Sequence, residues 1–158
     1  MEKNFTLQKD YPGLLDYFSN MVKENKRLPF LTFASEAVHY LYDSFSTMDW
    51  VGFYLYDREE DVLYLGPYET GYDACEEIKP GKGVCGRALA EKRTIVVKDT
   101  SKESNYIACS SSTKSEIVVP VFDKDNNVIA VLDIDSDTLN AFNNKDQENL
   151  EALVKLIK

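Results

Sequence analysis

Three cysteines, Cys75, Cys85 and Cys109, are the residues of this chain best suited to covalent chemistry, and all of them lie in one central segment. The N-terminal residues lack the basic stretch and apolar run that mark an export signal. We therefore expect a cytoplasmic protein whose thiols are kept reduced. Any disulfide among the three should then form transiently, during a reaction.

The neighbours of each thiol predict different reactivities, because only the thiolate is a nucleophile. Cys85 lies at the predicted start of a helix, where free N–H groups and the helix dipole favour the anion. Cys109 precedes three serines whose hydroxyl groups can donate hydrogen bonds to an anion. Cys75 precedes two glutamates that disfavour its thiolate, so it suits the role of a resolving thiol better than that of first nucleophile. The alternative for each cysteine is a buried thiol that serves only as a small apolar side chain.

Zinc binding is another use of clustered cysteines, but the spacing in this chain argues against a structural zinc site. No two cysteines form a C-x-x-C pair, and the single histidine, His39, lies well before them in a predicted helix. We expect no metal and no resident cofactor.

Three acidic residues form the second group with chemical potential. Asp133 and Asp135 lie two apart on a predicted strand, so their side chains share one face about 6.5–7 Å apart. Glu116 begins the predicted partner strand, and a suitable register adds its carboxylate to the same face. Such a cluster can receive a ligand ammonium, or it can hold a protonated acid that donates to an oxygen. A solvated sheet end is the alternative.

An aromatic pair precedes these residues. Trp50 and Tyr54 lie four apart on a predicted strand, on the same side as Gly52 between them. Gly52 leaves a gap that could hold a small apolar group such as a methyl group between the two rings. Ordinary core packing is the alternative.

The composition fits one domain over residues 1–158. The chain is 44% hydrophobic, and no linker or repeat marks a boundary. Its net charge of −9 argues against nucleic acid as a partner, and its apolar runs are too short to span a membrane.

Hydrophobic periodicity predicts an α+β fold with a central antiparallel sheet and helices mainly on one face. Two long loops, at residues 66–82 and 98–114, adjoin the cysteines, and loops of that length are usually functional. The predicted helices cover 11–22, 29–45, 85–92 and 150–157, and the predicted strands cover 50–56, 62–65, 94–97, 117–122 and 128–134.

These features together resemble the free methionine-(R)-sulfoxide reductases, short single-domain enzymes with the GAF fold. The resemblance covers residues 49–136 well. It is carried by the motifs WVGFY (50–54), LGP (65–67), GKGVCG (81–86), IAC (107–109), KSEIVVP (114–120) and VLDID (131–135).

The resemblance implies a role for each candidate residue. Cys109 would attack the sulfoxide sulfur and become a sulfenic acid, Cys75 would be the main resolving cysteine, and Cys85 would be an auxiliary thiol. A thioredoxin-type dithiol would then reduce the resulting disulfide. The acidic cluster would engage the ammonium and the polarised sulfoxide of free methionine sulfoxide, and the aromatic pair would surround its S-methyl group.

The chain also departs from the family pattern around these residues. It has Asn105 and Tyr106 where a Gly-His pair is usual, Arg87 where a threonine is common, and an altered, longer loop before Cys75. We therefore expect an active enzyme with an unusual lid. Two alternatives stay open, a GAF-type binding or sensory module and a reductase of another sulfoxide. A homodimer fits the family habit and the apolar stripe of the first helix.

Overall fold

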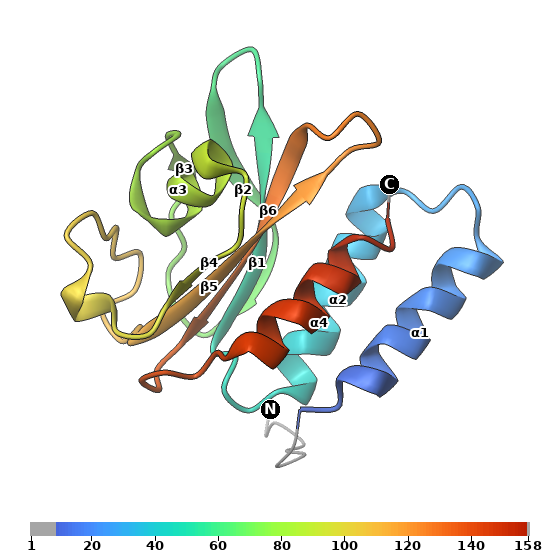
Figure 1. Cartoon of the computed structure of the whole chain (residues 1–158), viewed down its shortest axis with the longest axis horizontal. Helices are drawn as coiled ribbons and strands as arrows, with labels where there is room; N and C mark the ends of the chain where they lie inside the picture. Colours follow the sequence, from blue (N-terminus) through green and yellow to red (C-terminus); the bar gives the residue numbers. More distant parts are fainter. Residues whose placement is uncertain (1–8, 158) are drawn as a thin grey trace.

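The computed structural model describes residues 9–157, which form one six-stranded antiparallel sheet and the helices around it (Figure 1). The strand order is β3-β2-β1-β6-β5-β4. No helix in these residues has the length and apolarity needed to cross a membrane. In chain order the elements are α1 (Tyr11–Glu24), α2 (Phe30–Ser44), β1 (Trp50–Asp57), β2 (Val62–Thr70), β3 (Glu77–Ile78), α3 (Gly83–Glu91), β4 (Ile95–Val97), the 3-10 helix η1 (Thr100–Lys102), β5 (Ser115–Phe122), β6 (Val128–Ser136) and α4 (Asn144–Val154).

The two faces of the sheet have different coverings. Helices α1, α2 and α4 lie over one face, while α3 and the long loops lie over the other (Figure 1). Residues alternate between the faces with a period of two: Ile117 and Ile134 join the core under the three helices, whereas Val118 joins the smaller cluster under α3. The predicted antiparallel α+β architecture, with helices mainly on one face, is confirmed.

The N-terminal helices form where the apolar spacing predicts them. Leu14 and Phe18 of α1 are fully buried, as are Phe33 and Leu41 of α2. Pro29 is the residue before the first turn of α2 rather than part of it. The apolar stripe of α1 therefore packs into the core of its own chain.

The prediction of a loop over residues 66–82 is wrong at its start and near its end. Strand β2 continues to Thr70, and Glu77–Ile78 form the short strand β3. Gly66 and Pro67 lie in a bulge where both residues oppose Phe53 of β1, because Leu65 pairs with Tyr54 and Tyr68 pairs with Gly52. A proline in a bulge need not donate to the ladder, so the strand tolerates the two residues that otherwise indicate a loop.

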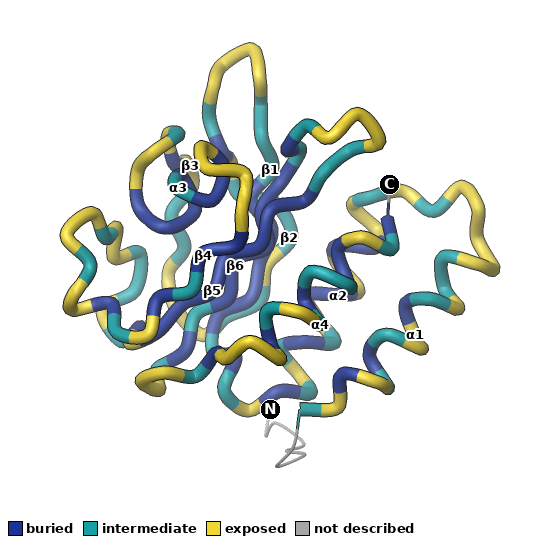
Figure 2. Tube along the Cα trace, in the orientation of Figure 1, coloured by how far each residue is buried: buried dark blue, intermediate teal, exposed yellow. Residues whose placement is uncertain are grey.

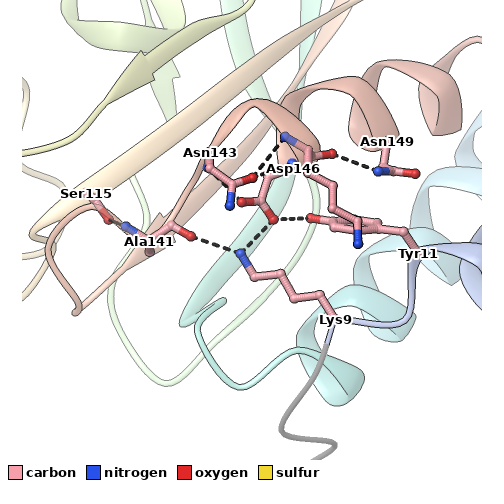
Figure 3. A network of polar contacts seen from close by, with 8 residues as sticks. Lys9, Tyr11, Ser115, Ala141, Asn143, Asp146 and Asn149 are labelled. Atoms are coloured by element: carbon pink, nitrogen blue, oxygen red, sulfur yellow. Dashed lines mark hydrogen bonds and ion pairs between the residues drawn. The ribbon is translucent and has the colours of Figure 1, made fainter.

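A buried polar network fastens the start of α1 to the start of α4 (Figure 3). One carboxylate oxygen of Asp146 accepts hydrogen bonds from Lys9 Nζ and from the Tyr11 hydroxyl, both at 2.6 Å. Lys9 Nζ also donates to the carbonyl of Ala141 at 2.9 Å. The other Asp146 oxygen accepts from the backbone N–H of Asn143, which completes a capping box at α4. Asp146 is only 2% exposed, so this charge depends on its partners.

Replacing Asp146 by asparagine keeps the size of the side chain and removes its charge. We expect the free energy of unfolding to fall by about 2–3 kcal/mol, because Lys9 and Tyr11 lose a charged, buried acceptor. Urea denaturation measures the change. The exposed turn residue Asp125 is the matched control, and Asp125→Asn should change stability by less than about 0.5 kcal/mol. Equal losses in the two variants would contradict a stabilising role for the network.

Candidate functional site

A disulfide joins Cys75, which lies between β2 and β3, to Cys109, which lies in the loop before β5. The two Cα atoms are 5.4 Å apart although the residues are 34 apart in sequence. Both residues are half-buried. The fold thus brings two of the three predicted reactive thiols into bonding contact, and in the described residues Cys85 is the free cysteine.

The three predicted acids lie together beside this disulfide. Glu116 of β5 pairs directly with Asp135 of β6, and Asp133 lies two residues back on the same face. Glu116 and Asp133 are 5% and 6% exposed, and Asp135 is partly exposed. The expected register is confirmed, and the alternative of a solvated sheet end is excluded for Glu116 and Asp133.

Burial and mutual repulsion determine the charge of this cluster. Burial first, and then the nearby Asp133 and Asp135, raise the pKa of Glu116 well above its ordinary value. Burial also raises the pKa of Asp135 well above its ordinary value, and that of Asp133 to a smaller extent. Like charges this close cannot all ionise, so the cluster retains protons at a pH where exposed carboxyl groups have lost theirs.

Cys85 faces the same cluster from the first turn of α3. Its side chain is 3% exposed, and burial, followed by the charges of Asp133 and Glu116, raises the pKa of its thiol well above the usual value. The expectation that the helix N-terminus makes Cys85 a thiolate is therefore wrong. The thiol points into the fold against carboxylates, and desolvation outweighs the dipole.

The aromatic pair lies next to the acids in a different arrangement from the one expected. Trp50 and Tyr54 stack with a centroid distance of 5.8 Å and an interplanar angle of 10°, and Tyr68 also stacks with Trp50, at 5.9 Å and 14°. A methyl group between two parallel rings needs planes about 7–8 Å apart, so no such gap exists here. The ring of Trp50 fills the space over Gly52, where an added Cβ would lie 2.5 Å from it. The Tyr54 hydroxyl instead donates to the carbonyl of Cys75 at 2.9 Å.

All eight predicted site residues except Cys75 line one small cavity. Its volume is about 20 Å³, enough for about one water molecule. Sequence reasoning missed the wall contributed by Tyr106 and Ile107, although these residues directly precede Cys109 in a loop of functional length. The full lining is Trp50, Tyr54, Ile78, Gly83, Val84, Cys85, Tyr106, Ile107, Cys109, Glu116, Asp133 and Asp135.

The segments that carry Cys75 and Cys109 are fastened by polar contacts. The Tyr72 hydroxyl donates to Asp137 Oδ2 at 2.6 Å, three residues before Cys75. In the loop before Cys109, Asn105 Nδ2 donates to the Gly81 carbonyl at 2.8 Å. Both contacts connect a loop that carries a cysteine to residues just outside a regular element, Asp137 after β6 and Gly81 before α3.

The family model and the similar proteins found by comparison agree on one family. The model of the GAF domain matches residues 30–158. The chain is 40% identical over 151 residues to GAF domain-containing protein A of Dictyostelium discoideum, covering 95% of this chain and 91% of that protein. It is 42% identical over 149 residues to the free methionine-R-sulfoxide reductase of Saccharomyces cerevisiae, covering 93% and 79% of the two chains.

A solved structure shows the same architecture. The X-ray structure of the free methionine-R-sulfoxide reductase of Neisseria meningitidis in complex with its substrate superposes with a TM-score of 0.87 at 35% identity. The match covers 98% of this chain and 92% of that chain.

Replacing Glu116 by glutamine removes one titrating carboxyl group from the buried cluster. The ordinary pKa is 4.5 and the folded value is higher, so between these two values the folded chain binds more protons than the unfolded chain. The stability contributed by the protonated group is complete below pH 4.5 and is lost as the pH rises to the folded pKa. We expect the urea midpoint of the unmodified chain to fall from pH 4.5 towards neutrality, and that of Glu116→Gln to fall less steeply.

The matched control is Glu77→Gln, which removes an exposed carboxyl group on β3 and should leave the slope unchanged. Identical slopes for Glu116→Gln and the unmodified chain would show that Glu116 ionises normally in the fold.

Proposed function

This chain belongs to the GAF-domain family and, within it, to the free methionine-R-sulfoxide reductases, and we propose that it reduces free methionine-(R)-sulfoxide to methionine. The observation that carries the proposal is the disulfide between Cys75 and Cys109, which lies beside a cavity lined by three carboxyl groups. The reaction needs a nucleophilic thiol, an acid for the sulfoxide oxygen and a second thiol to remove the oxidised product, and this site supplies each of them.

The first step transfers the sulfoxide oxygen to Cys109. The Cys109 sulfur attacks the sulfoxide sulfur while a carboxyl group protonates the oxygen, methionine leaves, and Cys109 becomes a sulfenic acid. One thiol and one sulfoxide thus give one sulfenic acid and one thioether. The raised pKa values of Glu116 and Asp135 support their role as the proton source, because burial favours the protonated form of each carboxyl group.

The second step forms the disulfide. The Cys75 thiol attacks the sulfur of the sulfenic acid, the S–S bond forms, and water leaves. Cys75 is favoured over Cys85 as the resolving thiol, because Cys85 is buried, has a raised pKa, and lies on a different element from the loop that reaches Cys109. A thioredoxin-type dithiol then exchanges with the disulfide and returns both thiols, without any resident cofactor.

Substrate binding needs an open form of this site. A cavity of about 20 Å³ holds about one water, so the disulfide form excludes the amino acid. Breaking the disulfide frees the two loops, and the acidic cluster then receives the substrate ammonium while Trp50 and Tyr54 contact the S-methyl group. The charge of the cluster favours a cation and disfavours an amide nitrogen, which explains a preference for the free amino acid over a peptide.

Two further expectations belong to the proposal. We place the enzyme in the cytoplasm, where a dithiol reductant is available. A homodimer stays a proposal as well. Because the stripe of α1 is buried in its own core, an interface has to use exposed apolar residues such as Tyr17 and Leu31.

Cys109→Ser removes the proposed nucleophile. We expect the turnover of free methionine-(R)-sulfoxide to fall at least about 10³-fold, because serine does not form the oxidised intermediate. Cys75→Ser should instead form one methionine per chain and then stop with a sulfenic acid that a sulfenic-acid probe detects by mass spectrometry. Unchanged turnover in Cys109→Ser would end the assignment.

Free-thiol counting separates the reductase from a binding module. In the absence of reductant, the reduced enzyme should lose two of its three thiols when the sulfoxide is added, whereas a module that only binds keeps all three. Peptide mapping should join the two lost sulfurs as Cys75–Cys109.

N-acetylation of the substrate tests the ammonium pocket. We expect kcat/KM for N-acetyl-methionine-(R)-sulfoxide to be about 10²-fold lower than for the free amino acid, since a charged donor to the carboxylates is lost. The unmodified amino acid assayed in parallel is the control. Equal kcat/KM for the two substrates would show that the acids do not bind the substrate ammonium.

A further inference from the structure

A thiol and two carboxylates from three different elements meet in the cavity. The Cys85 sulfur of α3, a carboxylate oxygen of Glu116 on β5 and a carboxylate oxygen of Asp133 on β6 all lie within 4.8 Å of one another. Their side chains are 3%, 5% and 6% exposed. Each is held by a regular element, so their arrangement does not depend on the loops that carry the disulfide.

The group lacks a positive partner. No lysine, arginine or histidine lines this cavity among residues 9–157. Asp133 Oδ1 is buried and has no hydrogen-bond partner, and the same is true of Asp135 Oδ1. Buried polar atoms are nearly always paired, so an unpaired carboxylate oxygen on a residue that lines a cavity is a position where a ligand can supply the missing partner. The Cys85 thiol and the Glu116 carboxyl group are hydrogen-bonded to Asp133 while they hold their protons. A cation that displaces those protons is the partner whose charge matches the three side chains.

We propose that Cys85, Glu116 and Asp133 form a binding site for a soft divalent cation, Zn²⁺. Tetrahedral zinc with bonds of about 2.3 Å to sulfur and about 2.0–2.2 Å to oxygen needs donor atoms about 3.3–3.6 Å apart. The donor atoms lie within 4.8 Å of one another, and metal binding would have to shorten any longer separations to that spacing. Asp135 or one water supplies the fourth ligand. Binding releases the thiol proton and the shared carboxyl protons to solvent.

Sequence spacing could not reveal this site. The spacing patterns that indicate a structural zinc site are those of closely spaced cysteines and histidines. Here one cysteine and two acids, separated by 31 and 48 residues from it, meet only through the packing of α3 on β5 and β6.

The ion would occupy the same carboxylates that receive the substrate ammonium. On the proposed function, Zn²⁺ therefore inhibits the enzyme competitively with methionine sulfoxide. The binding claim itself does not depend on that function, because it concerns a metal and three side chains.

The test uses the double variant Cys75→Ser/Cys109→Ser, in which Cys85 is the single remaining thiol and no disulfide closes the cavity. Co²⁺ serves as the spectroscopic substitute for Zn²⁺. We expect one Co²⁺ per chain, a near-ultraviolet sulfur-to-cobalt charge-transfer band and the visible bands of tetrahedral cobalt, all lost when Zn²⁺ is added. The further variant Cys85→Ala should abolish the charge-transfer band. Glu116→Gln should weaken Zn²⁺ binding at least about tenfold by competition with a chromogenic chelator.

Asp125→Asn, in the exposed turn, is the matched control and should bind as tightly as its parent. The far-ultraviolet circular dichroism of every variant establishes that it is folded. A charge-transfer band that is absent from the double variant overturns the site, and so does Zn²⁺ affinity that is equal with and without Cys85, which would mean an adventitious ion only. Metal binding without competition against the sulfoxide would keep the metal site and refute the shared ammonium pocket.

Discussion

Burying three carboxyl groups in one small cavity is the constraint on which the rest of this structure depends. Such a cluster is unfavourable by itself, because desolvation and repulsion both oppose the charged forms. The register of β5 with β6 maintains it, since Glu116 pairs with Asp135 while the neighbouring Ile117 and Ile134 lie in the core under the helices. A slip of one residue would move those isoleucines out of the core, so the apolar face of the sheet fixes the polar face. Figure 2 shows both strands buried along most of their length.

The second feature is the way the loops are fastened over this cluster. The positions at which the chain departs from its family pattern are also positions that make these contacts. Arg87 of α3 binds Glu103 at 2.9 Å, and Asn105 binds Gly81, so both connect the loop of Cys109 to the start of α3. Tyr72 connects the loop of Cys75 to Asp137 beyond β6. These contacts therefore fix how the two cysteine-bearing loops are attached to the start of α3 and to the end of β6.

The sequence predicted those parts of the molecule that follow from short-range periodicity. Alternation located both hairpins and placed Asp133 and Asp135 on one face, and the helical spacing located α1 and α2. Prediction from the sequence failed at positions where tertiary packing determines the conformation or the chemistry of a residue. Pro67 favoured a loop in the sequence. In the structure it lies in a bulge of β2 opposite Phe53, which depends on the pairing with β1. Cys85 was predicted to be a thiolate from its local sequence. The acids that help to raise its pKa, Glu116 and Asp133, lie 31 and 48 residues later and become its neighbours only in the fold. The Trp50 ring lies over Gly52, where it stacks with both Tyr54 and Tyr68, and Tyr68 comes from the neighbouring strand.

One property of the cavity accounts for both of its proposed ligands. Its acids retain protons because burial, and then the repulsion between neighbouring carboxylates, disfavour their charged forms. Protonated acids suit the donation of a proton to a sulfoxide oxygen, whereas the arrival of an ammonium or a metal ion drives the same groups towards the charged form. Cys85 has the same surroundings: its raised pKa makes it a poor nucleophile, and a bound cation would offset the carboxylate charges that help to raise that pKa. The described lining of the pocket contains acids and no basic residue, so the pocket favours ligands that carry a positive charge. Cys109 lines the same pocket, so its sulfur lies close to any ligand bound there.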